Sequence, residues 1–145
     1  MLVFLCRDLR VSLQRRGTKG STPMLITSSI DKRNGIILEV WAGDVSATDL
    51  AAYWKQLLVD PDALAIRRTL VDLRYGDISF SADELHYLVR TVAEPMLSGR
   101  SWRTALLVAN SIQHWVSCQY QSFATLYSSD AIFHDKDAAL KWLLQ

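Results

Sequence analysis

The sequence predicts an α/β domain in which helices pack on a mixed, mostly parallel sheet of four to five strands. Short apolar runs typical of strands alternate with longer segments whose apolar residues recur every three or four positions, as on one face of a helix. Two of the runs, "RRTLVDLR" and "TALLVAN", are almost continuously apolar at their centres, which is typical of strands covered on both faces. A serine followed three positions later by an acid precedes two of the helical segments, as in a capping box.

The first two strands are predicted to form a hairpin. Residues 24–30, "MLITSSI", and 36–42, "IILEVWA", flank Asn34-Gly35, a dipeptide that tight hairpin turns favour. We expect Trp41 to lie partly exposed, because a glutamate shares its side of the strand. The two predicted faces of the second strand are Ile36, Leu38 and Val40 on one side and Ile37, Glu39 and Trp41 on the other.

Residues 43–45 are expected to turn the chain into the first helix. Ser46 and Asp49 match a capping box at its start, and Pro61 is expected to end it. The apolar residues in between recur at helical spacing and predict a buried stripe. That stripe consists of Leu50, Tyr53, Trp54, Leu57 and Leu58.

The third strand is predicted over residues 67–74, and a second helix follows it. Ser81 and Glu84 match another capping box, while Pro95 and Gly99 are expected to end this helix. Its predicted buried residues are Leu85, Leu88, Val89, Val92 and Met96.

The rest of the chain is predicted to hold two more strands and two more helices. Strands are expected at 104–110 and 131–134, with a third helix over 111–127 between them and a final helix capped by Asp135. The resulting order, β-β-α-β-α-β-α-β-α, is that of a hairpin followed by βα units. The predicted inward-facing residues are Ile112, Trp115, Val116, Phe123 and Leu126 on the third helix and Ala138, Ala139, Trp142 and Leu143 on the final one.

Length, charge and cysteine content limit the class of protein. The 145 residues suit a single domain, which we assign to residues 24–145. A net charge of +1 provides no field that would attract nucleic acid, and no apolar stretch reaches the roughly 18 residues of a membrane span. Cys6 and Cys118 do not have the spacing of a disulfide framework or a zinc site. These features favour a cytoplasmic protein with free thiols.

Residues 1–23 differ in kind from the rest of the chain. They carry five basic side chains and one acid, and they end in a Gly/Ser/Thr/Pro cluster over residues 17–23. We interpret them as a basic N-terminal extension and expect it to be flexible. Three origins stay open: Met24 is the physiological start, the stretch is a weak amphipathic or targeting segment, or residues 2–14 form an extra strand or helix.

A group of polar residues is predicted to meet at one edge of the sheet. The loops that follow parallel strands gather at the same edge, where open α/β folds place ligands. Asp72 and Arg74 lie two apart on their strand, so they should point the same way. A purely structural interpretation also stands, because a strand-end Asp often accepts backbone N–H bonds and pairs with a neighbouring Arg. The candidate ligand- or partner-binding residues are Asp72, Arg74, Asp77, Ser81, Asn110 and His114.

Motifs of catalysis and metal binding are absent from the sequence. It has no nucleophile elbow, Gly-rich phosphate loop or HExxH, and His86 and His134 lack a partner at metal-ligand spacing. Trp102 between Arg100 and Arg103 fits a nucleic-acid contact, but the acidic balance of residues 24–145 favours an anchoring ring in a solvated loop. We therefore predict a protein that is not an enzyme and that binds no nucleic acid, metal or cofactor.

Several segments occur in an order that resembles a known family. They are the hairpin "MLITSSIDKRNGIILEVWAGDVSATDL", the strand "LVDLR" with its helix start "SADEL", the strand "ALLVAN" and, most specifically, the closing "AIFHDKDAALKWL". Residues 24–145 thus resemble the SpoIIAA-like, or STAS/Sec14-type, domains of bacteria. The resemblance implies a mixed sheet of four or five strands in a protein of the bacterial cytoplasm. Relatives include anti-sigma-factor antagonists, which are switched by phosphorylation of a serine at a strand-to-helix junction, and lipid-carrying Sec14-type domains.

The sequence departs from the antagonist pattern at that junction. The antagonists carry Asp-Ser, then Ser or Thr, then Gly, whereas residues 80–83 here are "FSAD". A phosphate on Ser81 would suit a helix N-terminus, but Asp83 and Glu84 would repel it. Val116 and Gln119 stand where many relatives carry Gly-x-x-Arg early in the third helix.

Three functional hypotheses follow, in order of preference. The first is a non-enzymatic cytoplasmic module of STAS-like type that contacts another protein, or itself, through its sheet edge and helix surfaces. The alternative is a binder of a small apolar or amphipathic ligand between the sheet and the helices, as in Sec14-type domains. The third is an enzyme that works at the edge with Asp72 and Arg74.

Overall fold

The computed structural model describes residues 8–9 and 25–145, which form a mixed sheet with helices on its faces. The first strand pairs with the second and the second with the third in antiparallel fashion, whereas each pairing from the third strand to the sixth is parallel. The predicted fold class is confirmed. The predicted flexible extension falls mostly on residues 1–7 and 10–24, which lie outside the described residues. Within the described residues the sheet has six strands, in the order β1 (Asp8–Leu9), β2 (Leu25–Asp31), β3 (Ile36–Val45), β4 (Arg68–Ile78), β5 (Trp102–Leu107) and β6 (Ser128–Phe133).

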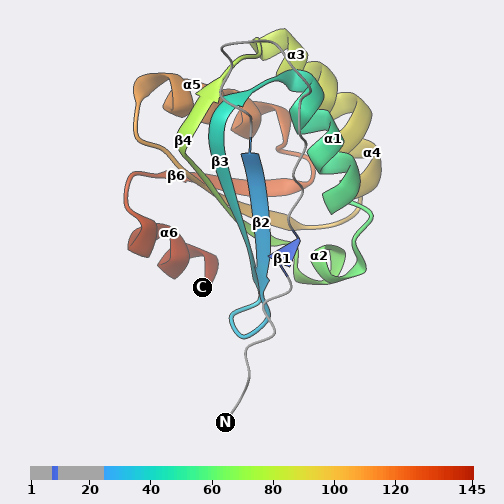
Figure 1. The fold of residues 1–145 in the computed structure, drawn as a ribbon. Coiled ribbons are helices and arrows are strands. Elements are labelled where there is room, and N and C mark those ends of the chain that lie inside the picture. Colours follow the sequence, from blue (N-terminus) through green and yellow to red (C-terminus); the bar gives the residue numbers. More distant parts are fainter. Residues whose placement is uncertain (1–7, 10–24) are drawn as a thin grey trace.

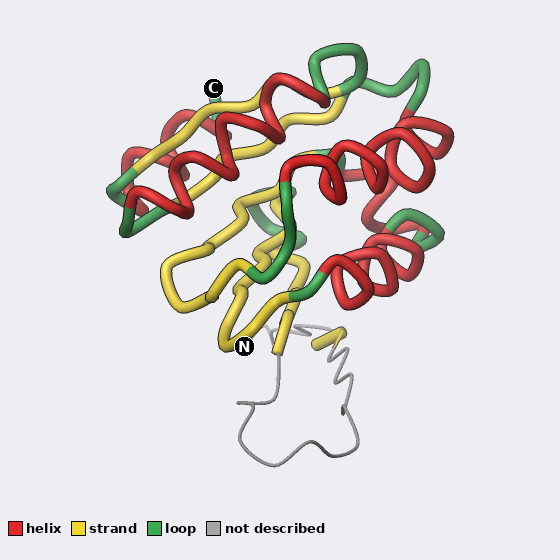
Figure 2. The backbone as a smooth tube through the Cα atoms, turned by 90° about the horizontal axis from the view of Figure 1, so that it is seen from above, coloured by secondary structure: helices red, strands yellow, loops and turns green. Residues whose placement is uncertain are grey.

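The two faces of the sheet carry different helices. The helical segments are α1 (Ala47–Leu57), α2 (Pro61–Ile66), α3 (Ala82–Leu88), the π-helical segment η1 (Val89–Ala93), α4 (Glu94–Leu97), α5 (Ser111–Phe123) and α6 (Lys136–Leu143). From β3 onward the chain alternates between strands and helices (Figure 2). α6 lies on one side of the strands, and α1, α3 and α4 lie on the other (Figure 1). Separate clusters of buried apolar residues fill these two sides.

The larger core lies between the sheet and helices α1 to α5. Ile37 on β3 and Leu50 on α1 are fully buried there. Burying one such side chain contributes about 1.5–3 kcal/mol, so this core supplies most of the apolar driving force for folding. Ala139 and Leu143 anchor α6 to the opposite face, as the spacing of the final helix predicts, while Ala138 is exposed instead of inward-facing.

β3 and β4 extend further than predicted. Residues 43–45 do not turn the chain but continue β3, where Gly43 lies opposite Gly76 and Val45 opposite Ile78. A Cβ added at Gly76 would lie 3.1 Å from Cβ of Trp41, so a larger residue there would crowd the neighbouring strand. β5 pairs with β4 only as far as Asp72, so the end of β3 and β4 forms a two-stranded ribbon beyond the main sheet.

Pro61 begins a helix as well as following one. α1 ends at Leu57, and Pro61 opens the short helix α2, which the sequence analysis did not predict. Asp60 caps α2 by accepting a hydrogen bond from the backbone N–H of Asp62. Proline suits the first helical position because its missing N–H would have no partner inside the helix there.

A π-helical turn displaces the buried stripe of the second predicted helix. Up to Val89 the buried residues are those predicted, but from the end of η1 onward they are Ala93 and Leu97 in place of Val92 and Met96. The π turn adds one residue to the helical repeat, and this rotates every later side chain by one position. Met96 is therefore exposed, contrary to the prediction.

α5 presents a different face to the core from the one predicted. Val116 is buried as expected, but Ile112 and Trp115 are 63% and 48% exposed, and Leu126 beyond the helix is 82% exposed. The buried face instead includes Gln113 and Ser117. The spacing of apolar residues does not predict the buried face here, because the polar side chain of Gln113 forms hydrogen bonds inside the protein.

The expected exposure of Trp41 is also wrong. Its side chain is buried, and its indole Nε1–H donates to the carboxylate of Glu39, 2.6 Å away. Trp102 is likewise buried at the start of β5, where its Nε1–H donates to Thr69, and so does not stand in a solvated loop. Both indoles pack in the interior because a partner in the sheet satisfies the polar end of each ring.

Candidate functional site

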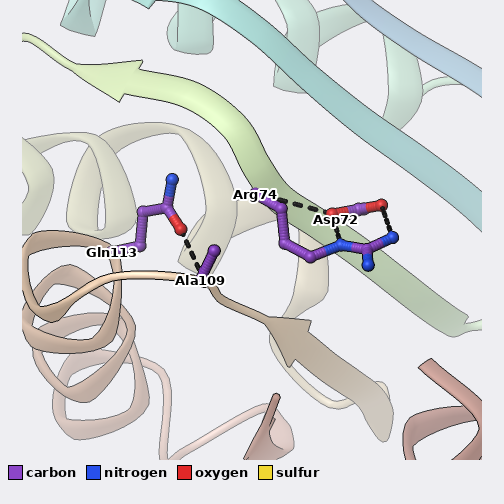
Figure 3. A network of polar contacts seen from close by, with 4 residues as sticks. All are labelled: Asp72, Arg74, Ala109 and Gln113. Atoms are coloured by element: carbon purple, nitrogen blue, oxygen red, sulfur yellow. Dashed lines mark hydrogen bonds and ion pairs between the residues drawn. The ribbon is translucent and has the colours of Figure 1, made fainter. Parts of the chain in front are cut away.

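Asp72 and Arg74 form a bidentate ion pair on β4. Nε and Nη2 of Arg74 donate to the two carboxylate oxygens of Asp72, each across 2.9 Å (Figure 3). The side chain of Asp72 is 9% exposed and that of Arg74 is 30% exposed. The carboxylate stabilises the charged guanidinium and raises the pKa of Arg74. The predicted pairing of these two residues is therefore present in the structure.

A local irregularity of the strand explains why these two residues stand there. Val40 lies opposite Asp72 and Ala42 lies opposite Tyr75, so β4 uses one residue more than β3 over this stretch. The extra residue leaves a backbone N–H without a ladder partner. The backbone N–H of Arg74 instead donates to Asp72 Oδ1 across 3.1 Å. The acid thus satisfies the irregular backbone, and the arginine neutralises the acid.

Gln113 holds the end of this ribbon to α5, and the sequence analysis missed it. Its Nε2 donates to the backbone carbonyl of Gly76 across 3.0 Å. Its Oε1 accepts from the backbone N–H of Ala109 across 2.8 Å (Figure 3). Gln113 is buried, so these two bonds tie β4 to the β5–α5 loop away from bulk solvent. The one available signal was a glutamine in the first turn of a helix, three positions after the capping residue Asn110.

The other predicted site residues occupy separate surface positions. Asp77 lies inside β4, which continues to Ile78, and not in the loop after it. Its side chain is exposed. Asn110 caps α5 through a bond from the backbone N–H of Gln113. The exposed ring of His114 stacks on His134, with centroids 6.0 Å apart. Within the described residues no hydrogen bond or ion pair joins any of these residues to Asp72 or Arg74.

Ser81 caps α3 as its capping box predicts. Ser81 Oγ accepts from the backbone N–H of Glu84 across 3.1 Å, and Glu84 accepts in return from the backbone N–H of Ser81. Ser81→Ala should therefore lower the free energy of unfolding by about 1 kcal/mol, as chemical denaturation would measure. Ser79→Ala is the control, because Ser79 is exposed and its side chain makes no hydrogen bond in the described structure. Equal stabilities of the two variants would contradict the capping role.

A second candidate site is a cavity of about 70 Å³ between the sheet and the helices. Glu39 on β3 lies in its lining, where Trp41 Nε1–H donates to one carboxyl oxygen and the hydroxyl of Tyr53 donates to the other across 3.0 Å. Pockets for drug-sized ligands measure about 300 Å³ or more. A lipid therefore does not fit this cavity unless the helices move apart.

Burial sets the protonation of the acids on this face of the sheet. Loss of solvent raises the pKa of Glu39 to about 7, although the bonds from Trp41 and Tyr53 oppose that rise. Burial also raises the pKa of Asp130 on β6 to about 6, against the lowering effect of the hydroxyl groups of Ser128 and Thr104. Among the described residues neither acid has a basic partner. Both are thus poised to bind or release a proton close to neutral pH.

The described part of the chain is also free of two further features, a metal-binding cluster and a membrane-spanning helix. It holds no cluster of three or more His, Cys, Asp or Glu side chains that could bind a metal ion, even though Cys118 lies beside His114. None of its helices is long and apolar enough to cross a membrane.

Comparisons with known proteins identify the fold. No protein-family model matched the chain, and a search of curated proteins found no match. Among solved structures, the chain is similar to an uncharacterised DUF3478-family protein with a SpoIIAA-like fold from Shewanella loihica PV-4. The two chains are 21% identical, and the match covers 83% of this chain and 93% of that one with a TM-score of 0.54. The fold of this chain is therefore SpoIIAA-like.

Proposed function

On the premise of this SpoIIAA-like fold, we propose that the chain is a non-enzymatic, cytoplasmic protein-interaction module. It binds another protein, or a second copy of itself, through the outer face of α5. The observation that carries this proposal is the exposure of Ile112 and Trp115, at 63% and 48%, one helical turn apart. Residues three apart share one side of a helix, so these two side chains form a joint apolar surface.

The composition of α5 supports the same proposal. Its thirteen residues include no Asp, Glu, Lys or Arg. A surface helix ordinarily carries charged residues on its outer face, whereas the centres of protein interfaces are depleted of charge and enriched in Trp. Val116 and Ser117 are buried on the inner face of α5, so the helix is firmly seated and its outer face is free to bind.

The polar residues of the candidate site support the non-enzymatic part of the proposal. Asp72 and Arg74 satisfy each other and an irregular backbone, Gln113 satisfies two backbone groups, and Asn110 caps a helix. A catalytic group needs a free acid, base or nucleophile that can reach a substrate. Each of these polar groups already has a structural role that accounts for it.

Replacing both Ile112 and Trp115 by serine is expected to weaken association by at least about 30-fold and to leave the fold intact. Truncating a Trp at the centre of an interface costs about 2 kcal/mol or more, which is roughly a 30-fold loss of affinity. Sedimentation over a range of concentrations tests association of the chain with itself. Affinity capture followed by titration of the purified partner tests binding of another protein.

The matched control is a double variant with Val59→Ser and Leu144→Ser. These two residues are 65% and 49% exposed and lie outside α5. A partner that binds α5 should no longer bind the double variant of Ile112 and Trp115, and it should still bind the control variant. The proposal fails if both double variants match the wild-type protein in sedimentation and in capture.

A further inference from the structure

The cavity that contains Glu39 combines one buried acid with walls of aromatic rings. We propose that it is a binding site for a short primary alkylammonium ion, which donates N–H hydrogen bonds to Glu39 and lays its alkyl end against the surrounding rings. This inference does not depend on the role proposed for α5.

Glu39 supplies the charge that calls for a cation. It is 3% exposed, and in the described residues the ion pairs are Arg74 with Asp72 and Arg90 with Glu94, so no basic side chain neutralises it. A carboxylate oxygen accepts two hydrogen bonds, whereas each oxygen of Glu39 accepts one, from Trp41 or Tyr53. A bound cation with N–H groups would occupy the remaining acceptor positions and remove the cost of a buried, unpaired charge.

The walls of the cavity favour an alkylated cation over a bare one. Aromatic faces attract a desolvated cation, and apolar side chains complete the enclosure where an alkyl group would lie. Trp54 and Tyr120 are the partly exposed residues of this lining, and their rings are 6.1 Å apart between α1 and α5. The aromatic residues of the lining are Trp41, Trp54, Phe80, Trp102 and Tyr120.

Ser117 is a second, independent sign of an unfilled polar position. Ser117 is among the residues that line the same cavity from α5, and it is 1% exposed. Its Oγ has no hydrogen-bond partner within the described structure. Buried hydroxyl groups are nearly always paired, so an unpaired one that faces a cavity points to a ligand or water that completes it.

The size of the cavity limits the ligand. Its volume of about 70 Å³ is well below the roughly 300 Å³ of pockets that hold drug-sized ligands, so only a small ion fits. Methylammonium has two heavy atoms and fits this space. Tetramethylammonium has five heavy atoms and no N–H group, so it should be rejected both by size and by chemistry.

The test is a titration of the ¹⁵N-labelled protein with methylammonium chloride at about pH 8.5, where Glu39 is ionised and the amine is still protonated. The indole N–H signal of Trp41 reports directly, because that group donates to Glu39. We expect a saturable shift of this signal. Glu39→Gln, which retains an acceptor for Trp41 but removes the charge, should weaken binding at least 10-fold, whereas Glu94→Gln, at a partly exposed acid, should bind as the wild-type protein does.

Matched probes separate cation recognition from other causes. Methanol has the size of methylammonium without the charge, and potassium chloride supplies the charge without an N–H donor. Neither should saturate the Trp41 signal, and tetramethylammonium should not either. The proposal is overturned if methylammonium produces no saturable shift, if methanol or potassium produces the same one, or if Glu39→Gln binds methylammonium as tightly as the wild-type protein.

Discussion

Glu39→Gln is expected to stabilise the protein by about 3 kcal/mol at pH 8 and to have little effect at pH 4.5. Burial raises the pKa of Glu39 from 4.5 to about 7 in the folded protein. Between these two values the folded state holds a proton that the unfolded state has released, so the free energy of unfolding of the wild-type protein falls as the pH rises. The contribution of Glu39 to the free energy of unfolding is complete below pH 4.5 and is lost as the pH rises through about 7.

The measurement is urea denaturation of both proteins at several pH values. Glutamine does not titrate, so the difference between the two curves isolates Glu39 from Asp130, whose raised pKa gives the wild-type protein and the variant the same additional slope. Glu94→Gln is the control, since this acid is partly exposed and forms an ion pair with Arg90. Parallel stability profiles of the wild-type protein and Glu39→Gln would show that Glu39 does not titrate near pH 7.

Gln113→Met is expected to lower the free energy of unfolding by about 2–4 kcal/mol. Methionine has a similar length but cannot replace the bonds to the carbonyl of Gly76 and the N–H of Ala109. Each buried backbone group left without a partner costs about 1–3 kcal/mol. Chemical denaturation measures the loss. Hydrogen exchange should also show faster exchange along the end of β4, because Gln113 holds that ribbon to α5.

Gln119→Met provides the matched control on the same helix. Gln119 is partly exposed, and its side chain makes no hydrogen bond within the described residues, so this variant should change stability by less than about 0.5 kcal/mol. Equal stabilities of Gln113→Met and Gln119→Met would mean that the two bonds of Gln113 contribute nothing to the fold.

Local chemistry accounts for the parts of the fold that the sequence analysis predicted correctly. Ser46, Ser81 and Asp135 each precede a helix and accept a hydrogen bond from its first turn, as their spacing predicts. Gly35 adopts a positive φ of 65° in the hairpin turn. These features depend on residues a few positions apart, so a linear pattern is enough to predict them.

The candidate sites were predicted less completely. The pairing of Asp72 with Arg74 follows from their spacing, but the reason for it, an irregular pairing with β3, involves a strand that lies far away in sequence. Glu39 was placed on the correct face of its strand and yet was expected near solvent. Its neighbours on that face, Ile37 and Trp41, are apolar, which was a signal that the face belongs to the core.

By itself the sequence predicted the α/β class, the alternation of strands and helices apart from β1 and α2, and the capped helix starts, because hydrophobic periodicity and capping act over a few residues. The SpoIIAA-like class followed from the resemblance of several segments to that family. Only the tertiary structure decided which polar side chains are buried. Glu39 meets Tyr53 across 14 positions and Gln113 meets Gly76 across 37. Whether a polar group can leave water depends on whether the fold supplies partners for it, and those partners come from distant segments of the chain. The same limit explains why the outer face of α5 and the acid inside the cavity became visible only in three dimensions.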